Sequence, residues 1–259
     1  MQKELKMKKI VHLTDLHLGD GNCTETFDNV VNNIIGRLTR ANEYIIIITG
    51  DLMEKVKSIE DYALAKDYIV KLENAGFIVL VVPGNHDYGR GTKQDEEFVP
   101  MFKDVFYGDK YLQYPKKDVI DGIAFIGLDS MEEEVKGDSI FADGRLGELQ
   151  LNRLNDMLNE DNDIRNAIKR VVYLHHRPFD YLATGHLLND REDLKRTIQG
   201  KVDVLLFGHR HKHKTFHGEW GIPRIYDGGS STKKNGDYSP HVIIDIVGNR
   251  SNDISTDFY

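Results

Sequence analysis

The chain has 259 residues, of which 40% are hydrophobic and 29% charged, with a formal net charge of −8 at pH 7. This composition predicts a soluble globular protein with a sizeable core, and an acidic chain is not an obvious binder of nucleic acid or anionic membranes. Cys23 is the only cysteine, which excludes an intramolecular disulfide, and no apolar run is long enough for a signal peptide or a membrane span, so a cytoplasmic protein is expected.

Short apolar runs alternate along the chain with amphipathic segments. Runs rich in Ile and Val predict buried strands at Lys9–Leu13, Tyr44–Ile48, Phe77–Val82, Ile123–Leu128, Arg170–Leu174, Val202–Phe207, Arg224–Tyr226 and His241–Ile246. Apolar residues three and four positions apart predict helices at Thr24–Arg40, Ile59–Glu73, Phe98–Phe106, Leu146–Leu158 and Glu192–Ile198. This alternation predicts an α/β architecture. Because no repeat or linker interrupts it, we expect one domain over residues 1–259.

Five of the predicted strands run directly into histidines, carboxylates or a carboxamide. In chain order these residues are Asp15 and His17, Asp51, Asn85 to Asp87, His175 and His176, and His209 and His211. Ligands of an open α/β sheet bind outside the carboxyl ends of its strands, so these side chains should converge in space. Gly50, Gly84 and Gly208 would allow sharp exits from the strands or close backbone approach. The polar stretch from residue 88 to 118 predicts an excursion over this face.

The chemistry of these side chains points to metal ions. Imidazole, carboxylate and carboxamide groups suit Mn, Fe or Zn, and without a cysteine cluster a structural zinc finger is excluded. The groups are too many for one ion but fit two ions that share a bridging carboxylate. Two such ions can clamp a phosphoryl group for an in-line displacement.

The five blocks read Asp15-Leu16-His17, Gly50-Asp51, Gly84-Asn85-His86-Asp87, His175-His176 and Gly208-His209-Arg210-His211. With all five in this order, the sequence resembles the calcineurin-like metallophosphoesterase family. Each block alone is a weak match, and the ordered set is specific. The resemblance implies a four-layer α/β/β/α sandwich of two mixed sheets flanked by helices.

The resemblance also implies roles for the residues in these blocks. One metal would be held by Asp15, His17 and His211, the other by Asn85, His175 and His209, and Asp51 would bridge both. His86 would face the substrate as a catalytic group, and Asp87 could orient it by accepting its second ring N–H. The spacing to Pro178 favours His175 over His176 as the ligand. For Arg177 two interpretations stand, a cation beside the substrate phosphate or a solvated residue.

These expectations describe a dinuclear-metal-dependent phosphoester hydrolase, most similar to the small bacterial phosphodiesterases of the family. Its substrate would be a small nucleotide-like or glycerol-type phosphodiester, attacked by a metal-bridging hydroxide. A phosphomonoesterase, a protein phosphatase and a catalytically silent metal-binding scaffold remain as alternatives. Nucleic acid is not favoured, because no basic, aromatic-laced tract appears, no membrane partner is expected, and the sequence does not predict the oligomeric state.

Three features outside the blocks have weaker interpretations. His12 lies within the first predicted strand, so it is expected in the core or at a sheet edge. His213 lies either at the mouth of the site or on the ordinary surface. The small-residue turn at Ser230 to Thr232 could approach the site but has no predicted role.

Overall fold

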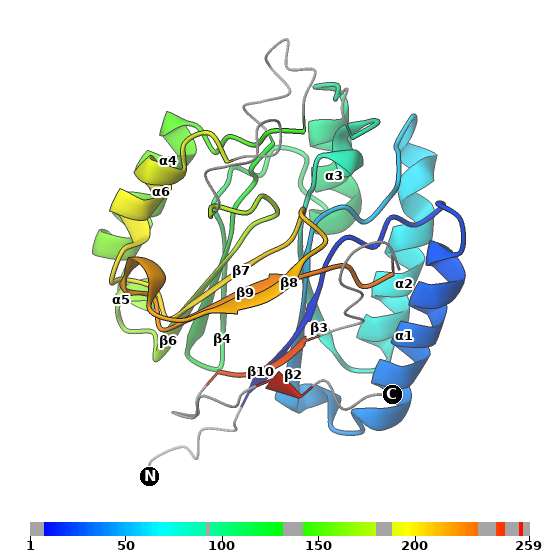
Figure 1. Ribbon diagram of the computed structural model, residues 1–259, viewed down its shortest axis with the longest axis horizontal. Helices are drawn as coiled ribbons and strands as arrows, with labels where there is room; N and C mark the ends of the chain where they lie inside the picture. Colours follow the sequence, from blue (N-terminus) through cyan, green and yellow to red (C-terminus); the bar gives the residue numbers. More distant parts are fainter. Residues whose placement is uncertain are drawn as a thin grey trace.

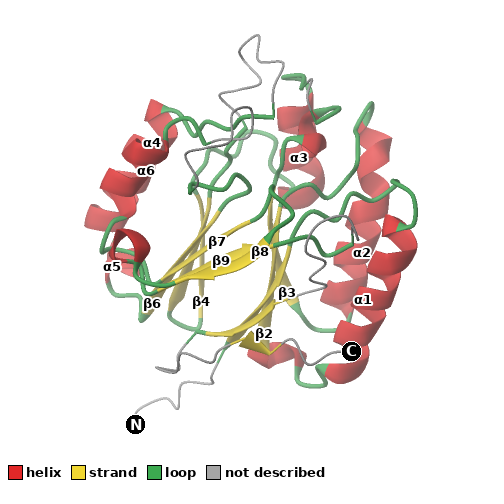
Figure 2. Ribbon diagram, in the orientation of Figure 1, coloured by secondary structure: helices red, strands yellow, loops and turns green. Residues whose placement is uncertain are grey.

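The computed structural model describes residues 8–91, 94–131, 142–179, 188–232, 242–246 and 254–255. Two mixed β-sheets face each other, and helices cover the outer face of each sheet (Figures 1 and 2). The expected four-layer α/β/β/α sandwich is confirmed. Of the predicted strand at His241–Ile246, His241 lies outside the described residues.

The first sheet has the strand order β11-β10-β1-β2-β3. Its strands are β1 (Lys9–Leu13), β2 (Tyr44–Thr49), β3 (Ile78–Val82), β10 (Val242–Asp245) and β11 (Ile254–Ser255). β1, β2 and β3 are parallel, whereas β10 is antiparallel to both β1 and β11. The outer face packs against α1 (Cys23–Arg37), α2 (Ala63–Asn74) and α3 (Phe98–Tyr107).

The second sheet has the order β4-β5-β6-β7-β9-β8. Its strands are β4 (Lys116–Ile120), β5 (Ile123–Gly127), β6 (Lys169–Tyr173), β7 (Val204–Phe207), β8 (His213–Phe216) and β9 (Arg224–Gly228). The four central strands are parallel, and the edge strands β4 and β8 are antiparallel to their neighbours. Helices α4 (Glu148–Glu160), α5 (Asn162–Arg165) and α6 (Arg191–Ile198) cover its outer face.

The β2 strand shows why these runs are apolar on both faces. Ile45 and Ile47 point into the core between the sheets, while Ile46 and Ile48 point into the core beneath the helices. All four side chains are buried, because successive residues of a strand face opposite sides. An uninterrupted apolar run is therefore what a strand between two layers requires.

Several elements differ from the sequence-based expectation. The stretch from residue 88 to 118 reaches the site at Gly91, whose carbonyl accepts from Asn85, and also contains α3 and the start of β4. β4 went unpredicted since its sequence, Lys-Lys-Asp-Val-Ile, alternates half-buried and exposed positions at a sheet edge. β8, α5 and β11 were also not predicted. In addition, the helix expected from Ile59 begins as a 3₁₀ turn to Tyr62 before α2. None of the helices in the described residues could span a membrane.

Short 3₁₀ turns complete the described structure at Ala41–Glu43 (η1), Ile59–Tyr62 (η2), His86–Tyr88 (η3) and Glu219–Gly221 (η4). The η3 turn follows β3 directly and carries His86. Because β1, β2 and β3 are parallel, as are β6 and β7, their carboxyl ends form a common edge. The predicted site residues follow these ends.

Candidate metal centre

The seven predicted metal ligands converge at this edge, although they come from two different sheets. Five of them are buried, namely Asp15, His17, Asp51, Asn85 and His175. His209 and His211 are half-buried and follow β7. The expected convergence of the strand-end residues is therefore present in the fold.

Asp15, His17 and His211 form the first cluster. The Nε2 atom of His211 lies 3.1 Å from Oδ1 of Asp15 and 3.0 Å from Nε2 of His17. Ligand atoms that bind one transition metal at about 2.1 Å lie about 3.0–3.4 Å apart in octahedral or tetrahedral geometry. The three side chains thus present one donor atom each at a spacing that suits a single ion.

Asn85, His175 and His209 form the second cluster. Oδ1 of Asn85 lies 3.0 Å from Nε2 of His175 and 3.1 Å from Nδ1 of His209, and these two nitrogens are 3.1 Å apart. Asp51 lies between the clusters, because its Oδ2 atom is 3.4 Å from Nε2 of His175 and 3.7 Å from Nε2 of His17. One carboxylate oxygen therefore faces both groups.

Contacts on the far side of His175, Asn85 and His17 fix which of their atoms face the clusters. The Nδ1 atom of His175 donates to the Thr49 carbonyl at 2.8 Å, so the Nε2 lone pair points inward. The amide nitrogen of Asn85 donates to the Gly91 carbonyl at 2.9 Å, which turns its oxygen inward. In the same way, Nδ1 of His17 lies 2.8 Å from Oε2 of Glu54.

The two carboxylates are anchored in the same manner. Oδ2 of Asp15 accepts hydrogen bonds from the Thr14 hydroxyl at 2.7 Å and from the backbone N–H of His209 at 3.0 Å. Oδ1 of Asp51 accepts from the backbone N–H of His86 at 2.9 Å. In each carboxylate the other oxygen is the one that faces the clusters. The donor set is thus oriented as two neighbouring cation sites require.

The electrostatics around Asp51 also favour a cation between the two clusters. Burial opposes ionisation of Asp51, but His175, His86 and His17 around it hold its pKa well below its usual value. Burial also disfavours the charged form of His175, yet the carboxylates of Asp51 and Asp15 raise its pKa to about 9. The buried carboxylates thus favour positive charge at the place where the clusters would hold metal ions.

The backbone of the clusters is strained. Non-glycine residues rarely adopt positive φ, and those that do concentrate at functional sites. Five of the seven proposed ligands have such a backbone, with φ of 52° at Asp15, 46° at His17, 51° at Asp51, 74° at His209 and 50° at His211. This strain is an observation independent of residue type, and it coincides with the clusters.

Two motif glycines are required by close packing against these residues. A side chain at position 84 would collide with the carboxylate and backbone N–H of Asp51, and one at position 208 would collide with Thr14 and with the carboxylate of Asp15. Gly84 and Gly208 therefore let neighbouring strand ends approach closely enough to share the site.

The structure corrects the expected partner of His86. Its ring Nδ1 lies 2.6 Å from the backbone carbonyl of Glu54, not on Asp87. Asp87 instead accepts backbone N–H groups of Leu52, Met53 and Gly84 at 2.8–3.2 Å, so it joins the turns after β2 and β3. Burial and the charge of Asp51 raise the pKa of Asp87 to about 7, although these hydrogen bonds lower it.

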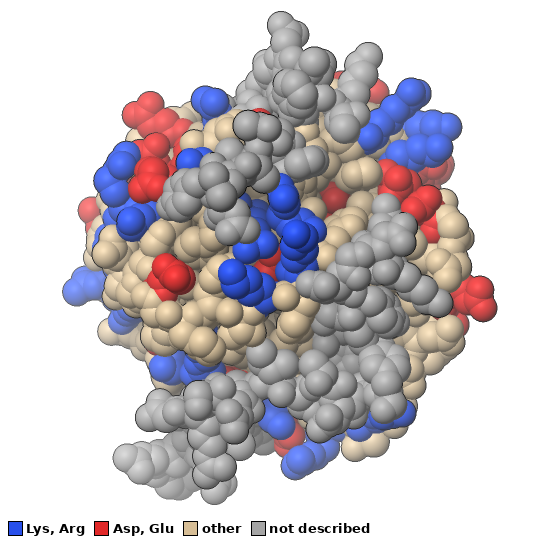
Figure 3. All heavy atoms as spheres, in the orientation of Figure 1, with Lys and Arg blue, Asp and Glu red and all other residues tan. Residues whose placement is uncertain are grey.

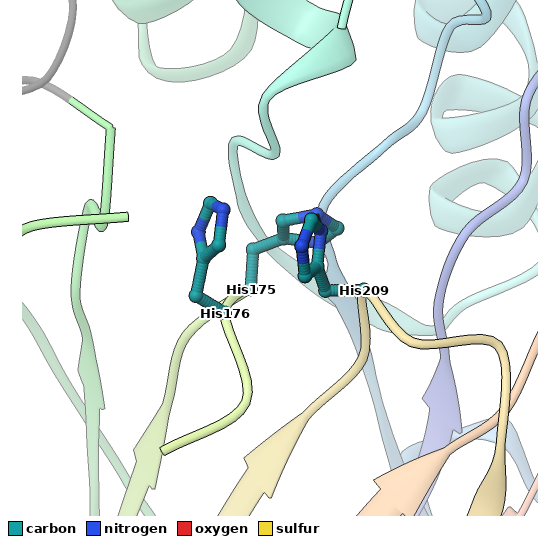
Figure 4. A group of neighbouring side chains, drawn as sticks. All are labelled: His175, His176 and His209. Carbon is teal, nitrogen blue, oxygen red and sulfur yellow. Dashed lines mark hydrogen bonds between the residues drawn. The ribbon is translucent and has the colours of Figure 1, made fainter. Parts of the chain in front are cut away.

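His176 and Arg177 are both buried and bonded to protein atoms. The Nε2 atom of His176 lies 3.2 Å from the Ala142 carbonyl, which can only accept, so Nδ1 accepts from the Ser130 hydroxyl at 2.7 Å. Both ring nitrogens are thereby used, although the ring packs against those of His209 and His175, with centroids 4.3 and 5.0 Å away (Figure 4). Burial, followed by the charge of His175, lowers the pKa of His176 to about 3.

Of the two interpretations of Arg177, the solvated residue is wrong. Nη1 of Arg177 lies 3.3 Å from Oδ2 of Asp227, another buried residue, and the guanidinium carbon is 5.2 Å from the centre of the Phe216 ring. The side chain is therefore not solvated, and its charge is engaged by Asp227.

Sequence reasoning missed two groups that support the site. Glu54 was not predicted, and it contacts both His17 and His86. The small-residue turn holds the backbone after β1, because the hydroxyl of Ser230 donates to the Asp15 carbonyl at 3.0 Å and that of Thr232 to the Leu16 carbonyl at 2.5 Å. The run of small hydroxyl residues was a sequence signal for the turn. A single glutamate such as Glu54 has no comparable sequence signal.

Comparison with known proteins agrees with the site. The model of the calcineurin-like phosphoesterase family matches residues 8–213. The chain belongs to this family. It is accordingly a metal-dependent phosphoester hydrolase, with clusters of His and Asp that could hold the metal ions. No curated protein matches the sequence.

Solved structures share the fold of this phosphoesterase at low sequence identity. A dimetal phosphatase from Danio rerio has a TM-score of 0.62 at 12% identity, with 93% of each chain covered. A protein from Thermus thermophilus has a TM-score of 0.54 at 12% identity, covering 92% of this chain and 94% of that one. GAP50, described as the anchor in the inner membrane complex of Plasmodium, has a TM-score of 0.59 at 14% identity, covering 92% and 80%.

Proposed function

We propose that this phosphoesterase hydrolyses a small phosphodiester with two transition metal ions, Mn, Fe or Zn. Asp15, His17 and His211 would hold one ion and Asn85, His175 and His209 the other, with Asp51 between them. The observation that carries the proposal is the shared position of Asp51 Oδ2, within 3.7 Å of a nitrogen from each cluster. When bound, the ions would neutralise the phosphate oxygens and lower the pKa of a water.

The protein's own contribution to the reaction centres on His86. Because Nδ1 of His86 lies 2.6 Å from a carbonyl, it carries a hydrogen, so Nε2 would give a proton to the leaving oxygen only from the doubly protonated ring. The backbone N–H of His86 is held by Asp51, and its ring lies edge-on to His17 at 4.8 Å between centroids. The ring is therefore fixed beside the clusters.

The preference for a diester rests on the His-His and Gly-His-x-His spacing, which resembles that of small bacterial phosphodiesterases. The test compares bis(4-nitrophenyl) phosphate with 4-nitrophenyl phosphate, using protein loaded with Mn²⁺. We expect a higher kcat/KM for the diester and no turnover after treatment with a chelator. Faster turnover of the monoester would make the protein a phosphomonoesterase, and activity in a metal-stripped sample would refute the mechanism.

Two variants separate metal binding from proton transfer. His86→Ala should keep two equivalents of metal, measured by elemental analysis, and lose about 100-fold or more in kcat. Asp51→Asn should lose metal as well as activity. Asp163→Asn, an exposed carboxylate in α5, serves as the matched control. A wild-type protein with one or no metal and no turnover would instead indicate a scaffold.

A further inference from the structure

The segment between β7 and β8 alternates histidine with cations. Arg210, Lys212 and Lys214 follow His209, His211 and His213, and no Asp or Glu occurs from Gly208 to Gly218. In a chain with a net charge of −8, this is a local concentration of positive charge. Figure 3 shows Lys and Arg side chains gathered at the centre of one face, over the place where Figure 1 shows the loop that joins β7 to β8.

Two of these cations alternate in the chain with the proposed metal ligands His209 and His211. The Cα atoms of Arg210 and Lys212 are about 3.8 Å from those of the neighbouring histidines, His209 and His211. Arg210 is half-buried and Lys212 exposed. Within the described part of the chain, neither side chain has an ion-pair partner. Among the described residues, no carboxylate therefore neutralises their charges.

The nearby cations Lys214 and Arg177 have contacts of their own. The ammonium of Lys214 lies 4.5 Å from the centre of the Phe216 ring, and Arg177 is paired with Asp227. Lys214 also lies in β8, an edge strand, where lysine commonly prevents pairing with another sheet. That explanation does not extend to Arg210 and Lys212, which precede the strand.

Electrostatics indicates what these two cations would bind. Cations beside a site that holds two metal ions repel them, and an anionic ligand reverses the sign of that interaction. The metal ions account for the phosphate that reacts. A further anionic group on the same substrate would meet Arg210 and Lys212, and arginine in particular suits the oxygens of a phosphate.

We propose that Arg210 and Lys212 bind a second phosphate group of the substrate. The substrate is then a small phosphodiester that carries an additional phosphate, such as a nucleotide ester phosphorylated elsewhere on the sugar. This inference rests on the proposed function and narrows its substrate class.

The test uses two esters that differ by one phosphate. They are the 4-nitrophenyl ester of thymidine 5′-phosphate and the same ester with a 3′-phosphate. The readout is the ratio of kcat/KM for the second ester to that for the first. We expect a ratio of about ten or more in the wild type, and a loss of most of it in Arg210→Gln and in Lys212→Gln, mainly through KM.

Two control variants define the outcomes. Lys201→Gln removes a lysine before the amino end of β7, opposite the site, and Lys214→Gln removes the neighbouring charge of β8. Both should keep the wild-type ratio. A wild-type ratio near one, an unchanged ratio in the Arg210 and Lys212 variants, or an equal loss in Lys214→Gln would overturn the inference.

Binding measurements separate this inference from the proposed function. If bis(4-nitrophenyl) phosphate is not hydrolysed, the proposed function has failed. Calorimetry with Mn²⁺-loaded protein then compares thymidine 3′,5′-bisphosphate with thymidine 5′-phosphate. Tighter binding of the bisphosphate in the wild type, lost in Arg210→Gln and Lys212→Gln, supports the second phosphate site, and equal affinities refute it.

Discussion

The hydroxyl of Tyr88 donates to Oδ2 of Asp129 at 2.7 Å and so joins the two sheets at the level of the site. Tyr88 ends the η3 turn that carries His86, and Asp129 follows β5 of the second sheet. Both residues are buried. The side chain of Gln150 holds the backbone of Asp129 through two hydrogen bonds, at 2.9 and 2.7 Å. The bridge therefore fixes the His86 turn against the sheet that supplies His175.

Tyr88→Phe removes this bridge while keeping the ring. We expect kcat for a phosphodiester to fall about tenfold with little change in KM, because His86 loses its fixed position. The free energy of unfolding should fall by about 1–2 kcal/mol. Tyr107→Phe is the matched control, since its hydroxyl also bonds inside the protein, to the Val81 carbonyl at 2.9 Å. Identical kinetics in the two variants would contradict a positioning role for Tyr88.

Glu54→Ala tests the support of His17. The substitution removes the carboxylate 2.8 Å from Nδ1 of His17 but keeps the backbone carbonyl that contacts His86. Affinity for the ion that Asp15, His17 and His211 would hold should fall about 10–100-fold, as is usual when the partner of a ligating histidine is lost. Titration with Mn²⁺ measures this. Glu73→Ala, at an exposed position near the end of α2, should leave metal affinity unchanged, and an equal loss there would exclude a specific role for Glu54.

His211→Gly tests whether the positive φ at the site is strained. Glycine adopts the φ of 50° at position 211 without a Cβ penalty, whereas His211→Ala loses the same contact with Asp15 and keeps the Cβ. Metal-free His211→Gly should therefore unfold with a free energy about 1 kcal/mol higher than His211→Ala. Activity should be lost in both. At His213, in β8 where φ is not positive, the glycine variant should instead be the less stable of the two. Denaturant unfolding in the presence of a chelator compares each pair, and a His211→Gly less stable than His211→Ala would show that the strain is small.

His12→Gln tests a pH dependence of stability at a buried histidine that is not a proposed metal ligand. Burial, reinforced by His213, lowers the pKa of His12 to about 3, compared with about 6.5 in the unfolded chain. The unfolded state therefore binds a proton as the pH falls below about 6.5, and the folded state does not. At pH 5 this costs the folded protein about 2 kcal/mol, and at pH 7 it costs almost nothing.

The glutamine variant removes this titration and can still bond the Thr49 hydroxyl, which lies 2.9 Å from Nε2 of His12. Urea unfolding at pH 7 and pH 5 should show a shallower loss of stability than in the wild type. His217→Gln, at an exposed position, should retain the wild-type slope. Equal slopes in all three proteins would mean that His12 is protonated in the folded state.

Much of the fold and of the site was predictable, because both depend on local patterns. The run from Tyr44 to Ile48 predicts a strand between two layers, and Gly50-Asp51 after it predicts where a ligand turns inward. The convergence of these ends follows from parallel strands. β4 was missed because Lys116 and Asp118 resemble loop residues when their sheet edge is not known.

Other features depend on contacts between distant segments and leave no local signal. In the sequence, Glu54 is indistinguishable from other acidic loop residues. Only the fold places it against His17. The pairing of Asp87 with the turn after β2, rather than with His86, depends on how two strand ends pack. The burial of Arg177 likewise depends on Asp227, which lies on another strand.

The division of the proposed ligands between two sheets links metal binding to folding. Asp15, His17, Asp51 and Asn85 follow strands of the first sheet, and the three remaining histidines follow strands of the second. No donor set is complete in either half alone, so ions would bind the packed sandwich and not the separated sheets. At a free metal concentration 1,000 times Kd, each ion would stabilise the folded state by about 4 kcal/mol. The metal centre would then act as a non-covalent crosslink, and the melting temperature of the protein would report metal supply.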